Sequence, residues 1–230
     1  MLRVNRSIYC GLFVIAVYFT ANRTYRRKIQ STEIFEIQRN LLFENPATNI
    51  LVSLNTVGFV LRKRMPLWLF YNSPITSPMS MTLSCFNHAN FGHFAMNMLG
   101  LSSFGPAVER QLGSEQFLAF YLTNGTLSSA ASSWFKTKTN NFVPSIGASG
   151  AVYSILGASA HKPDVYVGSI FLPGYSLPIS TAFPILVGVD LVGLIRGKSG
   201  FDHVAHISGA FLGYFGINWS QNIWKKINKN

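Results

Sequence analysis

The feature that most constrains this chain is a series of seven apolar segments, separated by loops that carry most of its basic residues. Only 12% of the residues are charged and 48% are hydrophobic, whereas a soluble domain carries about 25% charged residues. The pattern predicts an all-α membrane protein with one helical domain of several spans; a soluble all-helical protein is the alternative. The segments lie at about 7–21, 47–61, 88–108, 115–134, 149–160, 178–195 and 202–219.

Local signals mark several boundaries of these segments. Asn45-Pro46 predicts a helix start, with asparagine at the cap and proline in the first turn. Ser114 is expected to cap the helix of the segment 115–134. The stretch 66–82 carries three prolines and is expected to be a long loop. Some segments fall short of the ~20 residues that cross a bilayer, which is tolerated where Gly- and Ser-rich spans are buried in a bundle.

The first segment has a basic setting that allows two interpretations. Residues 1–30 contain six basic residues and no acidic one, as a secretory signal or a mitochondrial transit segment could. No small-residue cleavage site is evident, and basic residues flank both sides. We therefore interpret 7–21 as a retained first span and divide the chain into 1–45 (first span and basic connection), 46–220 (helical core) and 221–230 (basic tail).

The formal net charge of +11 would suit nucleic-acid binding, but no such motif accompanies it. The basic residues form short clusters between apolar segments, which favours contact with anionic lipid headgroups. The two cysteines, Cys10 and Cys85, are too few for a disulfide framework or a thiolate metal site. We expect the chain to have the lipid bilayer as a partner and not to bind nucleic acid.

Ser149 stands between glycines at the start of the fifth segment, in PSIGASGA. Gly147 and Gly150 remove side-chain bulk on both sides, so another chain can approach closely. A serine at a helix start can attack a carbonyl while backbone amides hold the oxyanion. The alternative is an ordinary helix cap.

His206 is the matching base candidate, in FDHVAHISGAFLGY. Small residues recur at every fourth position on its helix and on the helix that begins at Ser149, which predicts close packing that brings His206 to Ser149. A buried structural histidine is the alternative. These two ridges consist of Ala205, Gly209 and Gly213, and of Gly150, Ser154 and Ala158.

Further polar residues accompany this pair. His93 and Asn97 are spaced i, i+4 and share a helix face, from which both can donate to an oxyanion. His88 is expected to hold a loop. Asp202, four residues before His206, either orients it or caps the helix, and we favour the cap. Four histidines could suggest a metal site, but the spacing is not a zinc pattern, so no metal or other cofactor is expected.

The ordered set HxxxxHxxxN at 88–97, GxSG at 147–150 and AHxxG at 205–209 resembles the rhomboid intramembrane serine proteases. GSEQFLAFYL, PSIGASGA, the FLP at 171–173 and FDHVAH resemble the mitochondrial presenilin-associated branch of that family. The resemblance covers about 75–219. It implies Ser149 as nucleophile, His206 as base, and His93, Asn97 and the Ser149 amide as oxyanion hole.

The resemblance also implies a six-helix core preceded by one extra N-terminal helix. It implies a multi-pass protein of the mitochondrial inner membrane that cleaves single-pass membrane proteins, with a role in mitochondrial quality control. Two other functions compete with this one. A catalytically inactive relative would bind membrane clients, and a small transporter would use the same polar residues as a path but needs paired carboxylates or an inverted repeat.

Overall fold

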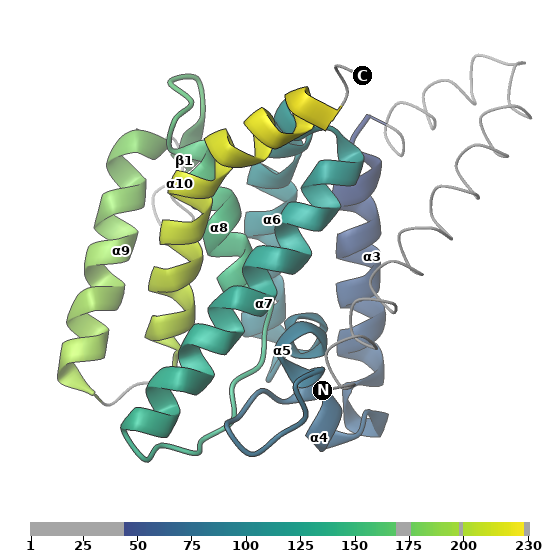
Figure 1. The fold of residues 1–230 in the computed structure, drawn as a ribbon, viewed down its shortest axis with the longest axis vertical. Coiled ribbons are helices and arrows are strands. Elements are labelled where there is room, and N and C mark those ends of the chain that lie inside the picture. Colours follow the sequence, from purple (N-terminus) through teal and green to yellow (C-terminus); the bar gives the residue numbers. More distant parts are fainter. Residues whose placement is uncertain (1–43, 169–175, 198–199, 228–230) are drawn as a thin grey trace, which may run out of the picture.

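The computed structural model describes the backbone of residues 44–168, 176–197 and 200–227. The predicted first span, 7–21, and the FLP motif lie outside these residues. Six longer helices form a bundle (Figure 1): α3 (Pro46–Leu61), α6 (Phe91–Leu112), α7 (Ser114–Lys138), α8 (Ser149–Ser159), α9 (Ile179–Arg196) and α10 (His203–Ile227).

Each of these helices matches one of the predicted apolar segments from the second to the seventh. The largest difference is at α10, which continues past the predicted end at 219 to Ile227, so the basic tail begins as helix. The predicted loop 66–82 is also partly wrong, because one short helix follows Pro66 and another begins just after Pro78. The short elements in and beside this stretch are η1 (Arg62–Arg64), α4 (Leu67–Phe70), α5 (Ser80–Leu83) and η2 (Ser84–Phe86).

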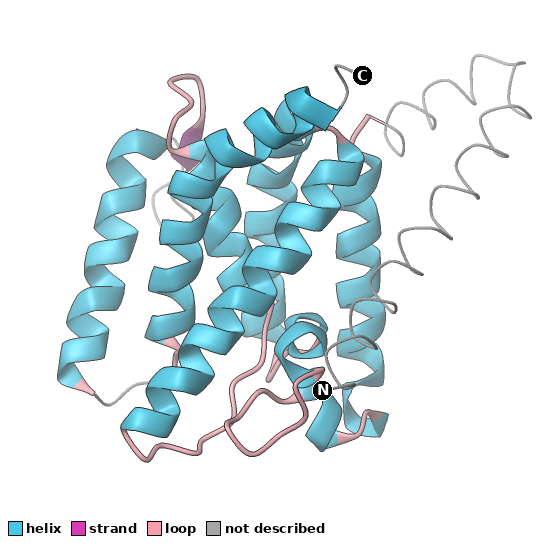
Figure 2. Ribbon diagram, viewed as in Figure 1, coloured by secondary structure: helices cyan, strands magenta, loops and turns pink. Residues whose placement is uncertain are grey.

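A two-stranded hairpin joins α8 to α9 at one end of the bundle (Figure 2). Strand β1 (Tyr166–Gly168) pairs antiparallel with β2 (Ser176–Pro178), and Val167 lies opposite Leu177.

Glu109, near the end of α6, provides the cap of α3 that the sequence assigned to Asn45. Its two carboxylate oxygens accept hydrogen bonds from the backbone N–H groups of Ala47 (2.9 Å) and Thr48 (2.8 Å). Asn45 occupies the cap position of α3, but its side chain does not bond the helix. Ser114 does not cap α7 either: its hydroxyl donates to Glu109, and Gly113 holds the cap position with a positive φ of 84°.

The short helix α8 is the centre of the bundle. Most of its residues are buried, and it packs against α6, α7 and most extensively α10. By contrast, α9 lies at the edge and packs mainly on α10 (Figure 1). The start of α8 therefore lies among other helices.

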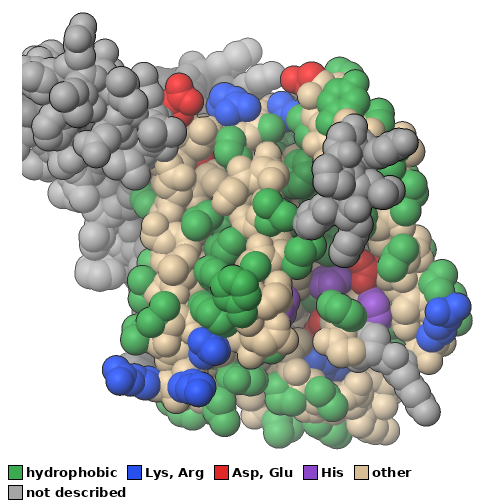
Figure 3. All heavy atoms as spheres, turned by 180° about the vertical axis from the view of Figure 1, so that it is seen from behind, with side chains coloured by type: hydrophobic (Ala, Val, Ile, Leu, Met, Phe, Trp, Pro, Cys, Tyr) green, Lys and Arg blue, Asp and Glu red, His purple; other side chains and the backbone are tan. Residues whose placement is uncertain are grey.

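Within the described residues, α9 alone is both long enough and apolar enough to cross a membrane, judged by its length and composition. The other helices carry glycine, serine or asparagine on buried faces, and these residues lower their hydropathy. Their outward faces are nevertheless apolar (Figure 3), with large exposed side chains at Val57, Val60, Leu127, Phe211 and Phe215, among others.

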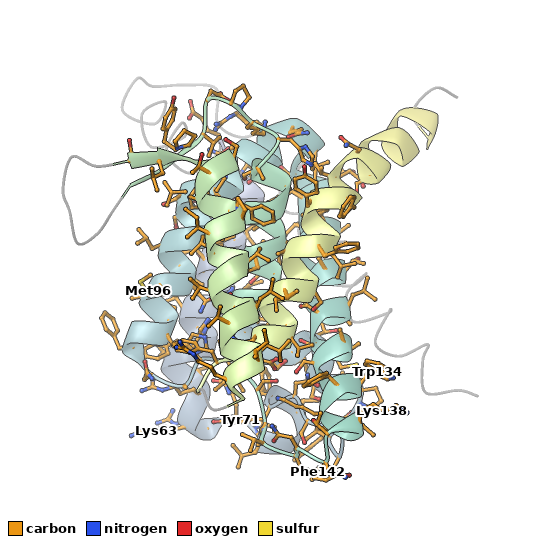
Figure 4. The ribbon with its side chains drawn as sticks, turned by 90° about the vertical axis from the view of Figure 1, so that its left-hand side faces the viewer. Lys63, Tyr71, Met96, Trp134, Lys138 and Phe142 are labelled. Carbon is orange, nitrogen blue, oxygen red and sulfur yellow. The ribbon has the colours of Figure 1, made fainter. Side chains whose placement is uncertain are left out.

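Basic and aromatic side chains gather at one end of the bundle. Lys63 and Lys138 lie at the same end, together with Tyr71 and Phe142 (Figure 4). Trp134, one turn before Lys138, is 64% exposed. This combination is typical of the level at which membrane proteins meet the headgroup region.

Candidate active site

The loop before α8 is tied to the bundle and delivers Ser149 into it. Asn72 and Ser145 exchange two backbone hydrogen bonds of 2.8 Å, and the Gly147 N–H donates to the Ser84 carbonyl at 3.0 Å. The side chain of Asn72, itself buried, donates to the Ser129 carbonyl of α7. Figure 2 shows this loop rising into the bundle to reach the start of α8. Ser149 is the first residue of α8, as the sequence predicted.

Gly147 is required at its position for two reasons. Its φ of +125° is in the region that side chains disfavour. A Cβ added there would also lie 2.5 Å from Cε1 and 2.7 Å from Nε2 of His93. The His93 ring therefore lies directly against the turn that precedes Ser149. His88 supports the same turn, since its Nε2 accepts the Ala148 N–H at 3.4 Å.

His206 reaches the start of α8 from α10. Its ring stacks on that of Tyr153, with centroids 4.4 Å apart and planes 9° from parallel. Ser149 and Tyr153 are spaced i, i+4 and share one face of α8. The stacked ring therefore lies one helical turn from Ser149. No hydrogen bond joins the Ser149 hydroxyl to His206 among the described residues, and catalytic hydrogen bonds are often long without substrate.

The predicted glycine ridges provide this approach. A Cβ on Gly209 would overlap the Gly150 carbonyl, and one on Gly213 would overlap that of Ser154. The two helices are thus in backbone contact along the ridge that the sequence indicated. This contact fixes the position of His206 along the helix axis relative to Ser149.

Asp190, in α9, is the partner of His206 that sequence reasoning missed. Its Oδ1 lies 2.8 Å from Nδ1 of His206 and 2.6 Å from Nδ1 of His203. A carboxylate accepts, so Nδ1 of His206 carries the proton and Nε2 keeps its lone pair. Tyr153 also interacts with this carboxyl group. One signal was available: Asp190 is the single ionisable residue in the apolar segment 178–195.

Asp202 does not contact His206 through its side chain. Its Oδ1 accepts the N–H of Ala205 at 3.1 Å, which caps α10. Its Oδ2 lies 2.5 Å from the Ser132 hydroxyl, which donates to it, and 3.3 Å from the Lys136 ammonium. Asp202 therefore joins the start of α10 to α7.

His93 and Asn97, the two side chains expected to bind the oxyanion, lie at different positions relative to the turn before Ser149. His93 lies at the turn, whereas Asn97 is buried one helical turn further along α6. The Asn97 amide donates to the carbonyl of His93 at 2.8 Å. It would have to turn away from its own helix to donate to a substrate.

A model of the rhomboid domain matches residues 76–218, well over half of the chain. The chain belongs to the rhomboid family. The predicted all-α membrane fold is thereby confirmed, while the arrangement of one helix plus six stays a prediction. The matched region includes both Ser149 and His206, together with the whole of α6 to α9.

Individual rhomboid relatives give the same assignment. The chain is 39% identical over 153 residues to Presenilin-associated rhomboid-like protein A, mitochondrial, of Danio rerio, which covers 66% of this chain and 40% of that protein. It is 29% identical over 216 residues to Rhomboid protein 1, mitochondrial, of Saccharomyces cerevisiae, covering 88% and 60%. It is 36% identical over 128 residues to Rhomboid protease GluP of Bacillus subtilis, covering 56% and 23%. The chain thus matches about two fifths of the length of its presenilin-associated relatives.

Proposed function

We propose that this rhomboid is an intramembrane serine protease with Ser149 as nucleophile and His206 as general base. The observation that carries the proposal is the position of His206. Tyr153 and Asp190 hold its ring from two sides, one turn from a serine at a helix start. The presence of a named protease among the relatives supports it.

The groups have complementary roles in this mechanism. The Ser149 hydroxyl attacks the substrate carbonyl while Nε2 of His206 takes its proton. The imidazolium that forms is stabilised by the Asp190 carboxylate. His206 then gives the proton to the leaving amine, and water hydrolyses the Ser149 ester by the reverse sequence of proton transfers.

The oxyanion has donors on both sides of the nucleophile. The backbone N–H of Ser149 is at a helix N-terminus, where amides lack helical partners. The His93 ring lies against Gly147 on the side of α6, and Asn97 follows it by one turn. His88, Gly147, Gly150, Gly209 and Asp202 act as supports.

For the biological setting we propose a multi-pass protein of the mitochondrial inner membrane that processes single-pass membrane proteins in protein quality control. The support is that two of the relatives are named as mitochondrial. We further propose residues 46–220 as the catalytic core, because α3 begins at Pro46 and the family match, which starts at 76, ends at 218. Subcellular fractionation of the tagged chain tests the location, and recovery outside mitochondrial membranes would contradict it.

Labelling with a fluorophosphonate serine probe tests the activity. The purified protein in mild detergent is compared with Ser149→Ala and His206→Ala. Ser102→Ala, on an exposed position of α6, is the matched serine control. We expect labelling of wild type and the control, and none of the other two variants.

An unlabelled wild-type protein that melts cooperatively would contradict the protease assignment. If that protein still captured a single-pass membrane segment, the client-binding alternative would be favoured. Labelling that persists in Ser149→Ala would assign the reactive serine elsewhere.

A further inference from the structure

Asp190, His203 and His206 form a cluster that the protease mechanism uses only in part. Each of the three residues offers one potential ligand atom, a carboxylate oxygen or an imidazole nitrogen, and these three atoms all lie within 4.8 Å of one another. One carboxylate oxygen thus faces two imidazole nitrogens, at 2.6 and 2.8 Å. Two imidazoles and a carboxylate are a common ligand set for zinc, with a fourth position left for water.

The charge balance of this cluster favours a cation. Asp190 is 4% exposed, and its ion-pair partners in the described part of the chain are the two histidines. Lysine and arginine do not pair with it there. A buried carboxylate needs a compensating positive charge, which either a proton on an imidazole or a bound metal ion supplies.

The geometry allows a metal ion with a small adjustment. Ligand atoms in a tetrahedral zinc site, bound at about 2.0–2.2 Å, lie about 3.3 Å apart. The two nitrogen–oxygen pairs must therefore widen by roughly 0.5 to 0.7 Å. The site is also accessible, because the side chains of His203 and His206 are 12% and 10% exposed. Figure 3 shows histidine and acidic side chains side by side in a hollow of the surface.

We propose that Asp190, His203 and His206 form an inhibitory zinc site that overlaps the catalytic base. Zinc on Nδ1 of His206 replaces the proton that Nδ1 shares with Asp190, and the neutral ring then carries its proton on Nε2. Nε2 therefore has no free lone pair with which to take the Ser149 proton. The inhibition rests on the proposed protease function, whereas the binding does not.

Zinc binding is measured on the full chain in detergent after removal of metals with a chelator. Competition with a chromophoric indicator gives stoichiometry and affinity for wild type, Asp190→Asn, His203→Asn and His161→Asn. His161, in the turn after α8, is the matched control, because its ring bonds the Tyr214 carbonyl of α10 and is not part of the cluster. We expect one zinc ion per chain, at least about tenfold weaker binding in the first two variants, and unchanged binding in the control.

Cobalt gives a test that needs no variant. Bound at this site in the wild-type protein, it should show the intense visible absorption of four-coordinate cobalt, and zinc should abolish it. Absence of equimolar zinc binding, or unchanged affinity in both Asp190→Asn and His203→Asn, would overturn the site.

Probe labelling then tests inhibition separately. Saturating zinc should suppress fluorophosphonate labelling of wild type, and His203→Asn should need at least about tenfold more zinc. Zinc binding without suppression would overturn the inhibitory role alone. Zinc binding by a wild-type protein that never labels would refute the protease and leave the metal site standing.

Discussion

Asp190 determines the chemistry of two histidines at the scale of single residues. Because its Oδ1 accepts from both Nδ1 atoms, it selects the tautomer in which Nε2 of His206 is the basic atom. Tyr153 then restrains the plane of that ring. Tyr153 on α8 thus sets the orientation of the ring, and Asp190 on α9 sets its tautomer.

Replacing Asp190 with asparagine should slow fluorophosphonate labelling of Ser149 by about a hundredfold or more. Asparagine nearly preserves the shape but removes the charge that stabilises the imidazolium. The initial labelling rate measures the effect. Asp164→Asn, in the exposed loop before β1, is the control and should label like wild type. A rate for Asp190→Asn within about twofold of wild type would contradict the role.

Gly147→Ala should destabilise the protein and abolish labelling. The positive φ alone costs about 1–3 kcal/mol for an alanine, and the added methyl group must displace His93. Thermal unfolding in detergent measures the loss. Gly188→Ala in α9, where a Cβ meets no atom within 4 Å, should be neutral or stabilising. Equal melting temperatures for the two variants would refute the argument.

At the scale of elements, two contacts set the register of the helices. The first is the cap that Glu109 of α6 provides for α3, with further hydrogen bonds from the hydroxyls of Thr48 and Ser114. The second is the glycine contact between α8 and α10. The helices that these contacts join must be aligned along their axes, because the loop before α8 otherwise cannot present Ser149.

Glu109→Gln should lower the free energy of unfolding by about 2–3 kcal/mol. The glutamine amide turns a donor toward N–H and O–H groups that need an acceptor, in a position that is 2% exposed. Glu115→Gln, exposed in the first turn of α7, is the matched control with little expected effect. Denaturant unfolding monitored by circular dichroism compares them, and similar midpoints would count against the cap.

Gly213→Ala should separate α8 from α10, because its methyl group would overlap the Ser154 backbone. Overpacking of this kind costs about 1–3 kcal/mol. Gly216→Ala lies one turn further on the same helix, where the nearest atom is 3.9 Å from the added Cβ, so it should melt like wild type. A Gly213→Ala protein with wild-type melting and labelling would show that the helices do not need this contact.

At the scale of the whole molecule, the scarcity of acidic residues matters. The chain has 8 acidic and 19 basic residues, so acidification adds positive charge to a protein that is already basic. Asp202 ties α7 to α10 in the described part of the fold and depends on its charge. Burial by itself would raise the pKa of Asp202, but Lys136 and the hydrogen bonds to the carboxylate outweigh it and hold the pKa below its usual value.

The stability that Asp202 contributes should therefore depend on pH. A depressed carboxyl pKa contributes fully above the usual carboxyl range and is lost as the pH falls below about 4, through the lowered pKa. Melting temperatures of wild type and Asp202→Asn should differ by a constant amount near neutral pH and converge in acid. A difference that persists unchanged in acid would show that the Asp202 charge is not responsible.

Much of the fold follows from local patterns in the sequence. Hydrophobic segments predicted the six described longer helices, because a helix is specified by residues within a few turns of one another. The small residues of α8 and α10 predicted their contact, since helices in membranes pack through such ridges. The position of Ser149 at a helix start followed from its flanking glycines. The sequence was misleading at Asn45, where the expected cap was a neighbour in sequence and the actual acceptor, Glu109, came from another helix. It was also misleading at Ser114, whose hydroxyl donates to Glu109 instead of capping α7.

The sequence by itself therefore determined the helices, their glycine contact and the candidate pair Ser149 and His206. Only the tertiary structure decided which carboxylate serves His206, which ring holds it, and which acid caps α3. Glu109 and Ala47 are 62 residues apart, and Asp190 comes from a different helix than His206. Hydrogen bonds of this kind depend on the angle and rotation at which helices pack, and no local pattern of residues records either quantity.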